Sequence, residues 1–144
     1  MIHVKIRLTP SARMPEYKSR GSSGADIFAS LKSPISIAPG KIALIPTGIY
    51  IELPEGYEAQ VRPRSGLALK HGITLLNTPG TIDSDYRGEV KLIIANFGKT
   101  FFVVEDGMRI AQMVFSRFYR GNFIEVDQIS ITERDEGGFG HTGI

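Results

Sequence analysis

Apolar and polar residues alternate with a period of two along much of this chain, and no other feature constrains its fold as strongly. Ile2, Val4, Ile6 and Leu8 alternate with polar residues, as in a strand that buries one face. Further strands are expected at residues 25–29, 35–37, 42–45, 48–53, 57–61, 90–96, 101–104, 110–118 and 123–129. Many short strands, mostly separated by Gly, Pro, Asn or Asp, predict a β-sandwich or barrel.

One short helix is expected in this otherwise all-β chain. It covers residues 66–70, with Ser65 as the N-cap. The composition then changes at residues 133–144, where four glycines accompany a single aromatic residue. We therefore expect one β domain over residues 1–132 and a mobile, glycine-rich C-terminal strap of the same domain over residues 133–144.

The composition excludes several classes of function. The 144 residues include no cysteine and three widely separated histidines, which excludes a disulfide framework, a thiol nucleophile and a Cys- or His-based metal site. Seventeen Lys and Arg against fifteen Asp and Glu give a net charge of +2, so no nucleic-acid partner is expected. No signal peptide is expected, because residues 1–20 hold no uninterrupted apolar segment, and no run of about 20 apolar residues that would span a membrane is found. We therefore expect a cytoplasmic protein with no membrane partner.

An acidic segment follows the turn-forming Pro79-Gly80 pair. Residues 83–89 hold three carboxylates within seven positions. A calcium-binding EF-hand loop that starts at Asp83 is excluded, because Arg87 occupies its fifth position and Ile94 its last. Two interpretations remain, a solvated acidic hairpin and a site that uses a carboxylate.

Two further segments contain residues that suit an anion. Arg64 and Ser65 lie where a strand leads into the expected helical turn, and a guanidinium, a hydroxyl and free N–H groups together bind phosphate well. The alternative is an ordinary helix cap. In the tail, Arg134, Phe139 and Thr142 lie among glycines, which describes either a strap that closes over a nucleotide or a frayed terminus.

Taken in order, five segments resemble the five motifs of the trimeric dUTPase family (deoxyuridine triphosphate nucleotidohydrolases). They are SGADI at 23–27, PRSGLA at 63–68, GTIDSDYRG at 80–88, GMRIAQ at 107–112 and the tail at 134–143. The resemblance spans nearly the whole chain. It implies a jelly-roll β-fold, a homotrimer whose active sites are each built from three subunits, and Mg²⁺-dependent hydrolysis of dUTP to dUMP and pyrophosphate. Such an activity keeps uracil out of DNA and supplies dUMP for thymidylate synthesis.

The resemblance also implies roles for residues near the acidic segment. Asp83 would orient and deprotonate the water that attacks the α-phosphorus in line, since an ionised carboxylate only accepts hydrogen bonds. Tyr86 would lie under the deoxyribose and leave no room for a 2′-hydroxyl. Asn77 and the backbone at Thr81 and Ile82 would hold the uracil edge.

Other residues would contact the phosphates. By the same resemblance, Arg64, Ser65 and Gly66 would reach them from a neighbouring subunit, and Gln112 would add a further contact. Lys91 would lie near the substrate, although a strand lysine that faces solvent is the alternative.

In the tail motif, Phe139 would stack on uracil while Arg134 and Thr142 bind the γ-phosphate. Two positions depart from the common family pattern, which has glycine after the arginine and serine before the threonine. This chain has Asp135 and His141 there, and Asp135 is a competitor for the Arg134 guanidinium.

The metal needs no direct protein ligand, because Mg²⁺ would be held mainly by the triphosphate. In the family, Asp26 would lie near the water shell of this metal. The alternative for Asp26 is a buried turn aspartate that caps backbone N–H groups.

Two rival functions are distinguishable by experiment. A dCTP deaminase of the same broad fold would release ammonia, although its catalytic glutamate segment is not found in this sequence. A nucleotide-sensing or partner-binding module would bind without turnover, and the intact Asp83 argues against it.

Overall fold

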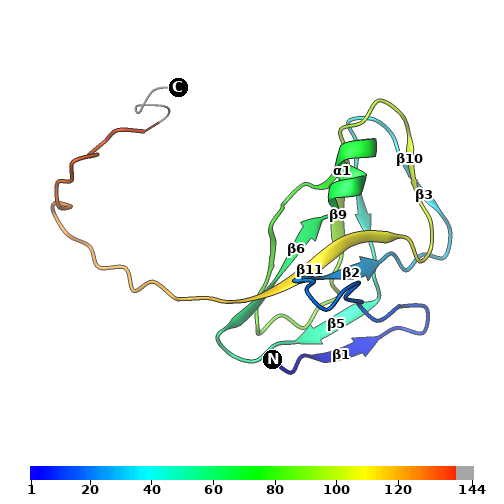
Figure 1. Cartoon of the computed structure of the whole chain (residues 1–144), viewed down its shortest axis with the longest axis horizontal. Helices are drawn as coiled ribbons and strands as arrows, with labels where there is room; N and C mark the ends of the chain where they lie inside the picture. Colours follow the sequence, from blue (N-terminus) through cyan, green and yellow to red (C-terminus); the bar gives the residue numbers. More distant parts are fainter. Residues whose placement is uncertain (139–144) are drawn as a thin grey trace.

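The computed structural model of the chain describes residues 1–138 (Figure 1). Over this range the chain forms β-strands and one short helix, as the all-β prediction requires. The elements are β1 (Lys5–Leu8), β2 (Gly24–Phe28), β3 (Ile35–Ile37), β4 (Ile42–Ile45), β5 (Ile49–Glu52), β6 (Tyr57–Pro63), α1 (Ser65–His71), β7 (Ile73–Leu75), β8 (Gly80–Ile82), β9 (Leu92–Asn96), β10 (Phe102–Val104) and β11 (Arg109–Arg117). Within residues 1–138, no helix is long and apolar enough to cross a membrane.

The strands of the described range form antiparallel sheets. A four-stranded sheet has the order β2-β11-β6-β8, and a three-stranded sheet has the order β4-β9-β7. Two-stranded sheets pair β1 with β5 and β10 with β3. Strands that pair are mostly distant in the sequence, so the chain crosses repeatedly from one sheet to another, as in the jelly-roll architecture.

The inward faces of these sheets bury a single cluster of aliphatic side chains. Ile27 and Met113 from the four-stranded sheet belong to the same cluster as Leu92 and Ile94 from the three-stranded sheet, and each is at most 1% exposed. Along β5, buried and half-buried residues alternate. This alternation is the period-two pattern of the sequence, seen in β5 as one face turned toward the core.

Most of the expected strands form, with small differences at their ends. Those at 35–37 and 42–45 have the predicted bounds, as β3 and β4. The sequence prediction omits β7 and β8, which are each three residues long.

One local prediction is wrong, and one of the two interpretations of the acidic segment is excluded. Ser65 is not the N-cap, because the helix begins at Ser65 itself and Arg64, in an extended conformation, precedes it without a side-chain capping hydrogen bond. The acidic segment is not a hairpin, because β8 pairs with β6 whereas β9 pairs with β4 and β7. Residues 83–91 therefore form a loop that links two different sheets, which we call the crossover loop.

After β11 the chain leaves the body of the molecule, as the extended segment in Figure 1 shows. We call residues 118–138 the C-terminal arm. The strand expected at 123–129 does not form there, because no described part of the chain lies alongside to pair with its backbone. Its large apolar side chains are exposed, with Phe123 at 98% and Ile129 at 87%. The boundary between residues 132 and 133 stays a prediction.

Candidate active site

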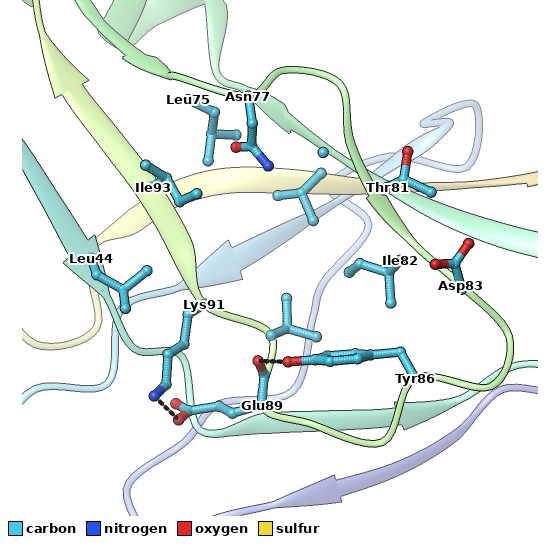
Figure 2. Close-up of a pocket in the computed structure, with 13 residues that line it drawn as sticks. Leu44, Leu75, Asn77, Thr81, Ile82, Asp83, Tyr86, Glu89, Lys91 and Ile93 are labelled. Atoms are coloured by element: carbon cyan, nitrogen blue, oxygen red, sulfur yellow. Dashed lines mark hydrogen bonds and ion pairs between the residues drawn. The ribbon is translucent and has the colours of Figure 1, made fainter.

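A hollow of about 300 Å³ opens between the two larger sheets, and the crossover loop forms one side of it (Figure 2). We call it the first hollow. Leu44, Leu75 and Ile93 from the three-stranded sheet give it an apolar wall. The sequence-predicted residues that line it are Asn77, Thr81, Ile82, Asp83, Tyr86 and Lys91.

The amide of Asn77 points into this hollow from the connection between β7 and β8 (Figure 2). It lies against Gly80, where an added Cβ atom would be 3.0 Å from the Asn77 Nδ2 atom. A primary amide carries both donors and an acceptor. Beside an apolar wall, this group suits the polar edge of a planar heterocycle.

Asp83 immediately follows β8, at the rim of the first hollow (Figure 2). The residue is exposed, and its carboxylate takes part in none of the ion pairs among residues 1–138. Its backbone carbonyl accepts a hydrogen bond from the N–H of Tyr86 at 3.2 Å. A carboxylate at a solvent-accessible rim can accept a hydrogen bond from a water molecule beside a bound ligand.

Tyr86, Glu89 and Lys91 are linked along the opposite side of the hollow. The Tyr86 hydroxyl donates to the Glu89 carbonyl at 3.1 Å, and the Lys91 ammonium lies 3.6 Å from the Glu89 carboxylate (Figure 2). Lys91 thus lines the hollow, and Glu89 partly neutralises its charge.

A second hollow, of about 360 Å³, collects a different set of sequence-predicted residues. Those that line it are Asp26, Arg64, Ser65, Gly66 and Gln112, and none of them lines the first hollow. Lys18 and Arg109 add positive charge to its wall. Hydroxyl, amide and guanidinium groups around one opening suit an anion with several oxygen atoms.

Asp26 lies at the centre of this second set. It is 8% exposed on β2, and its two carboxylate oxygens lie 3.2 Å from Arg64 Nε and 3.0 Å from Arg109 Nη1. Arg64 also donates from Nη1 to the carbonyl of Arg109 at 3.0 Å. Asp26 is therefore a strand residue that holds two guanidinium groups, rather than a turn aspartate.

The comparisons with known proteins bear on this arrangement. A dUTPase family profile matches residues 10–143 of the chain. The chain belongs to the dUTPase family. A deoxyuridine 5′-triphosphate nucleotidohydrolase of Thermoanaerobacter sp. (strain X514) is 57% identical to it over 99% of both chains, and one of Chlamydia pneumoniae is 56% identical over 97% of both. The solved dUTPase of Staphylococcus bacteriophage 80alpha with dUpNHpp superposes with a TM-score of 0.90, at 26% identity and 99% coverage of each chain. The predicted family and its jelly-roll β-fold are confirmed.

Sequence reasoning missed one arginine that lines the second hollow. In a regular strand, Arg109 and Gln112 would point to opposite faces, because they are three positions apart. The pairing of β11 with β2 is interrupted between Arg109 and Ala111, and both side chains line the second hollow. A β-bulge reorients side chains in this way and has no signature in the alternation pattern. The sequence feature that could have identified Arg109 was its position inside the GMRIAQ motif.

The tail motif of this family member is described only in part. Arg134 lies on the C-terminal arm, where its Nε atom donates to the carbonyl of Gly137 at 2.7 Å. Asp135 has a φ of 43°, in the left-handed region that glycine tolerates best. No ion pair joins Arg134 and Asp135 among residues 1–138. Phe139 and Thr142 lie outside the described residues, as does His141.

Proposed function

We propose that each dUTP molecule binds between two subunits, with its nucleoside in the first hollow of one subunit and its phosphates in the second hollow of a neighbour. The chain is a dUTP diphosphatase, which hydrolyses dUTP to dUMP and pyrophosphate. One observation supports this assignment of nucleoside and phosphates to different hollows. Residues expected at the nucleoside line one hollow, and residues expected at the phosphates line another.

In the first hollow, the base lies between the Asn77 amide and the apolar wall. The amide pairs with the polar edge of uracil together with the backbone at Thr81 and Ile82, and the slot is too narrow for the methyl group of thymine. The ring of Tyr86 lies under the sugar and leaves no space for a 2′-hydroxyl. Lys91 adds positive charge beside this end of the substrate. The bound dUpNHpp of the phage relative is consistent with a nucleotide in this fold.

Asp83 is the catalytic residue of the proposed reaction. Its carboxylate accepts a proton from a water molecule as the water oxygen forms a bond to the α-phosphorus. The bond from this phosphorus to the oxygen that bridges α and β breaks on the opposite side. That oxygen keeps the bonding electrons and departs with pyrophosphate, and dUMP carries the new oxygen. The exposed rim position of Asp83 suits this role.

The second hollow provides the phosphate contacts. Arg64 and Arg109 carry two positive charges against the single negative charge of Asp26, so the ion-paired group keeps a net attraction for phosphate. Because Asp26 and a backbone carbonyl hold part of the Arg64 fork, the remaining N–H groups have a fixed direction. Ser65 and the Gly66 backbone add contacts near the α–β bridge, and Gln112 adds another.

Magnesium is the cofactor proposed for this reaction. Among residues 1–138, no three acidic or histidine side chains are grouped as a metal site, and both Asp26 oxygens are ion-paired. These residues fit a cation that is carried by the triphosphate and its waters, since Mg²⁺ favours phosphate oxygens and retained water. Asp26 would contact its water shell. When bound, Mg²⁺ neutralises charge on the departing pyrophosphate.

A homotrimer with shared sites is part of the same proposal. The nucleoside and phosphate residues of one chain line hollows that share no residue, which fits sites that each combine the first hollow of one subunit with the second hollow of a neighbour. The C-terminal arm supports this assembly, because a single chain leaves Tyr119 and Phe123 98% exposed and apolar surface of this kind favours a protein partner. Arg134, Phe139 and Thr142 would then close the site from a third subunit.

The proposed role of Asp83 is tested with Asp83→Asn. We expect kcat for pyrophosphate release from dUTP to fall by about 10²- to 10⁴-fold, because the general base is lost. The Kd for dUTP should change little, since an amide occupies the same space. Asp85→Asn is the matched control, because it removes an exposed carboxylate from the same loop and should keep normal turnover.

The same assay separates the alternatives. Near-normal turnover by Asp83→Asn would contradict the role of Asp83. Loss of activity when EDTA removes Mg²⁺ is the result expected from the proposed cofactor. Ammonia release from dCTP in place of pyrophosphate release from dUTP would instead indicate a deaminase.

A further inference from the structure

The ring of Tyr86 borders the first hollow without being buried by its surroundings. The residue is 46% exposed, so packing alone does not fix the direction of the ring. One contact that restrains it is the hydrogen bond from its hydroxyl to the backbone carbonyl of Glu89, drawn in Figure 2. The orientation of the ring therefore depends on contacts within its own loop.

Gly88 makes the second of these contacts. A Cβ atom added at Gly88 would lie 2.2 Å from Oη, 2.4 Å from Cζ and 2.9 Å from Cε2 of Tyr86. These distances are too short for any real side chain, so a larger residue at this position would displace the ring. Gly88 does not have a positive φ, so its backbone would accept alanine. The position of the Tyr86 ring is what requires glycine here.

The carbonyl that accepts the hydroxyl is itself held in place. One carboxylate oxygen of Glu89 accepts a hydrogen bond from the N–H of Gly48 at 2.9 Å. The next residue, Val90, donates to the carbonyl of Ile49 at 2.8 Å and accepts a hydrogen bond from the buried Thr47 hydroxyl. This end of the crossover loop is therefore anchored to the segment that leads into β5, and it cannot shift to accommodate a displaced ring.

From these contacts we infer that Gly88 and the backbone carbonyl of Glu89 together position the Tyr86 ring and thereby set the preference for deoxyribose over ribose. Both are positioning groups, since they act through the ring. The inference rests on the proposed function, in which this ring lies under the sugar. A methyl group at Gly88 meets the hydroxyl end of the ring first, breaks its hydrogen bond and turns the half-exposed ring toward solvent. The ring then no longer blocks a 2′-hydroxyl.

The test compares pyrophosphate release from dUTP and from UTP, each measured as kcat/KM on the full chain. For Gly88→Ala we expect the dUTP to UTP ratio to fall by about 10- to 100-fold, the effect of a displacement of about 1 Å in a site. The matched control is Gly21→Ala. Gly21 is an exposed glycine without a positive φ, and an added Cβ there meets nothing within 4 Å, so the ratio should not change.

A double-mutant cycle isolates the effect that passes through the ring. In a Tyr86→Ala background, Gly88→Ala should change the ratio by less than about twofold, because no ring remains to be displaced. A general loosening of the loop would instead lower the ratio in both backgrounds, and that result would overturn the inference. A wild-type ratio in Gly88→Ala would overturn it as well.

The outcome for Tyr86→Ala alone separates this inference from the proposed function. If it lowers the ratio while Gly88→Ala does not, the inference fails and the role of Tyr86 stands. If Tyr86→Ala keeps the wild-type ratio, the proposed role of the ring fails and the inference fails with it.

A second variant covers the case in which Gly88→Ala does not fold, as judged by its melting temperature. Tyr86→Phe removes only the hydroxyl and its hydrogen bond to Glu89. It should lower the ratio by about 2- to 10-fold, the usual contribution of one hydrogen bond. An unchanged ratio would overturn the inference.

Discussion

Replacing Asp26 by asparagine removes the carboxylate that holds Arg64 and Arg109 together. The side chain of Asp26 is 11% exposed, against 28% for Arg64 and 41% for Arg109. An asparagine of the same shape offers one neutral acceptor and places an NH₂ group beside two cations. We expect Asp26→Asn to lower both the stability of the protein and its rate with dUTP.

The size of the stability loss follows from the exposure of the three groups. Breaking a fully buried ion pair costs about 3–5 kcal/mol, whereas exposed pairs contribute about 0–1 kcal/mol. Here the carboxylate is buried while both arginines regain some water, so an intermediate loss of about 2 kcal/mol is expected. For a chain of this size that loss lowers Tm by about 4–8 °C. Because oligomer stability depends on concentration, both proteins are compared at the same concentration.

Activity provides a second measurement on the same variant. Without Asp26 the guanidinium of Arg64 loses its fixed direction, although its hydrogen bond to the Arg109 carbonyl remains. We expect kcat/KM for dUTP to fall by about tenfold or more, since positioning of a charged group is what the second hollow supplies.

Glu52→Gln is the matched control for burial. The Lys5 ammonium lies 2.7 Å from the Glu52 carboxylate, closer than either pair of Asp26, but these side chains are 80% and 45% exposed. The hydrogen bond from Lys5 holds the pKa of Glu52 below its usual range. Any stabilisation is therefore present above the unfolded-state pKa and disappears as pH falls through the lowered value. Because both side chains are exposed, this stabilisation is small, so at neutral pH we expect Glu52→Gln to lower Tm much less than Asp26→Asn does.

Equal losses of Tm in the two variants would refute the reasoning, because distance rather than burial would then govern the contribution. A wild-type Tm for Asp26→Asn would refute it as well. Loss of stability with unchanged kcat/KM would show that Asp26 is structural only.

Three other perturbations test separate parts of the site. Gly24→Ala places a Cβ atom 2.6 Å from Gln112 Oε1, so the KM for dUTP should rise; an unchanged KM would argue against Gln112 as a ligand. A chain that ends at Glu133 should keep its fold by circular dichroism and lose about 100-fold in kcat/KM, because closure of the tail supplies phosphate contacts; unfolding would instead show that the tail is structural. Asp135→Gly removes the side chain from a residue in the left-handed region, which should stabilise that backbone conformation by about 1 kcal/mol. Steady-state kinetics should then show a higher kcat/KM for dUTP. A decrease would mean that the Asp135 side chain has a contact of its own.

The period-two pattern was sufficient to predict the fold class and most strands. A strand that buries one face leaves an alternating pattern in the sequence, as at Ile35–Ile37 and Ile49–Glu52. The same reasoning failed at residues 123–129. Residues 124–127 alternate as in a strand, but within the described chain no partner lies beside them, and a local pattern does not determine where a partner strand lies.

The site residues came from the family resemblance, and the contacts that it missed have a physical explanation. Asn77, Asp83 and Tyr86, which the resemblance assigned to the nucleoside or the attacking water, line one hollow. The resemblance did not identify Glu89 or Gly48, whose contact joins segments 41 positions apart. A contact of this kind depends on how two connections meet in space, which short-range patterns do not determine.

The first hollow has one wall on each of two sheets, and the crossover loop is the chain segment that links them. In the proposed function, the accuracy with which the enzyme recognises base and sugar is therefore coupled to the packing between these two sheets. A core substitution that lets the layers slide apart slightly would widen the slot without touching Asp83. The enzyme would then begin to cleave incorrect nucleotides before its rate with dUTP fell. Loss of specificity would therefore be an early sign of weakened core packing.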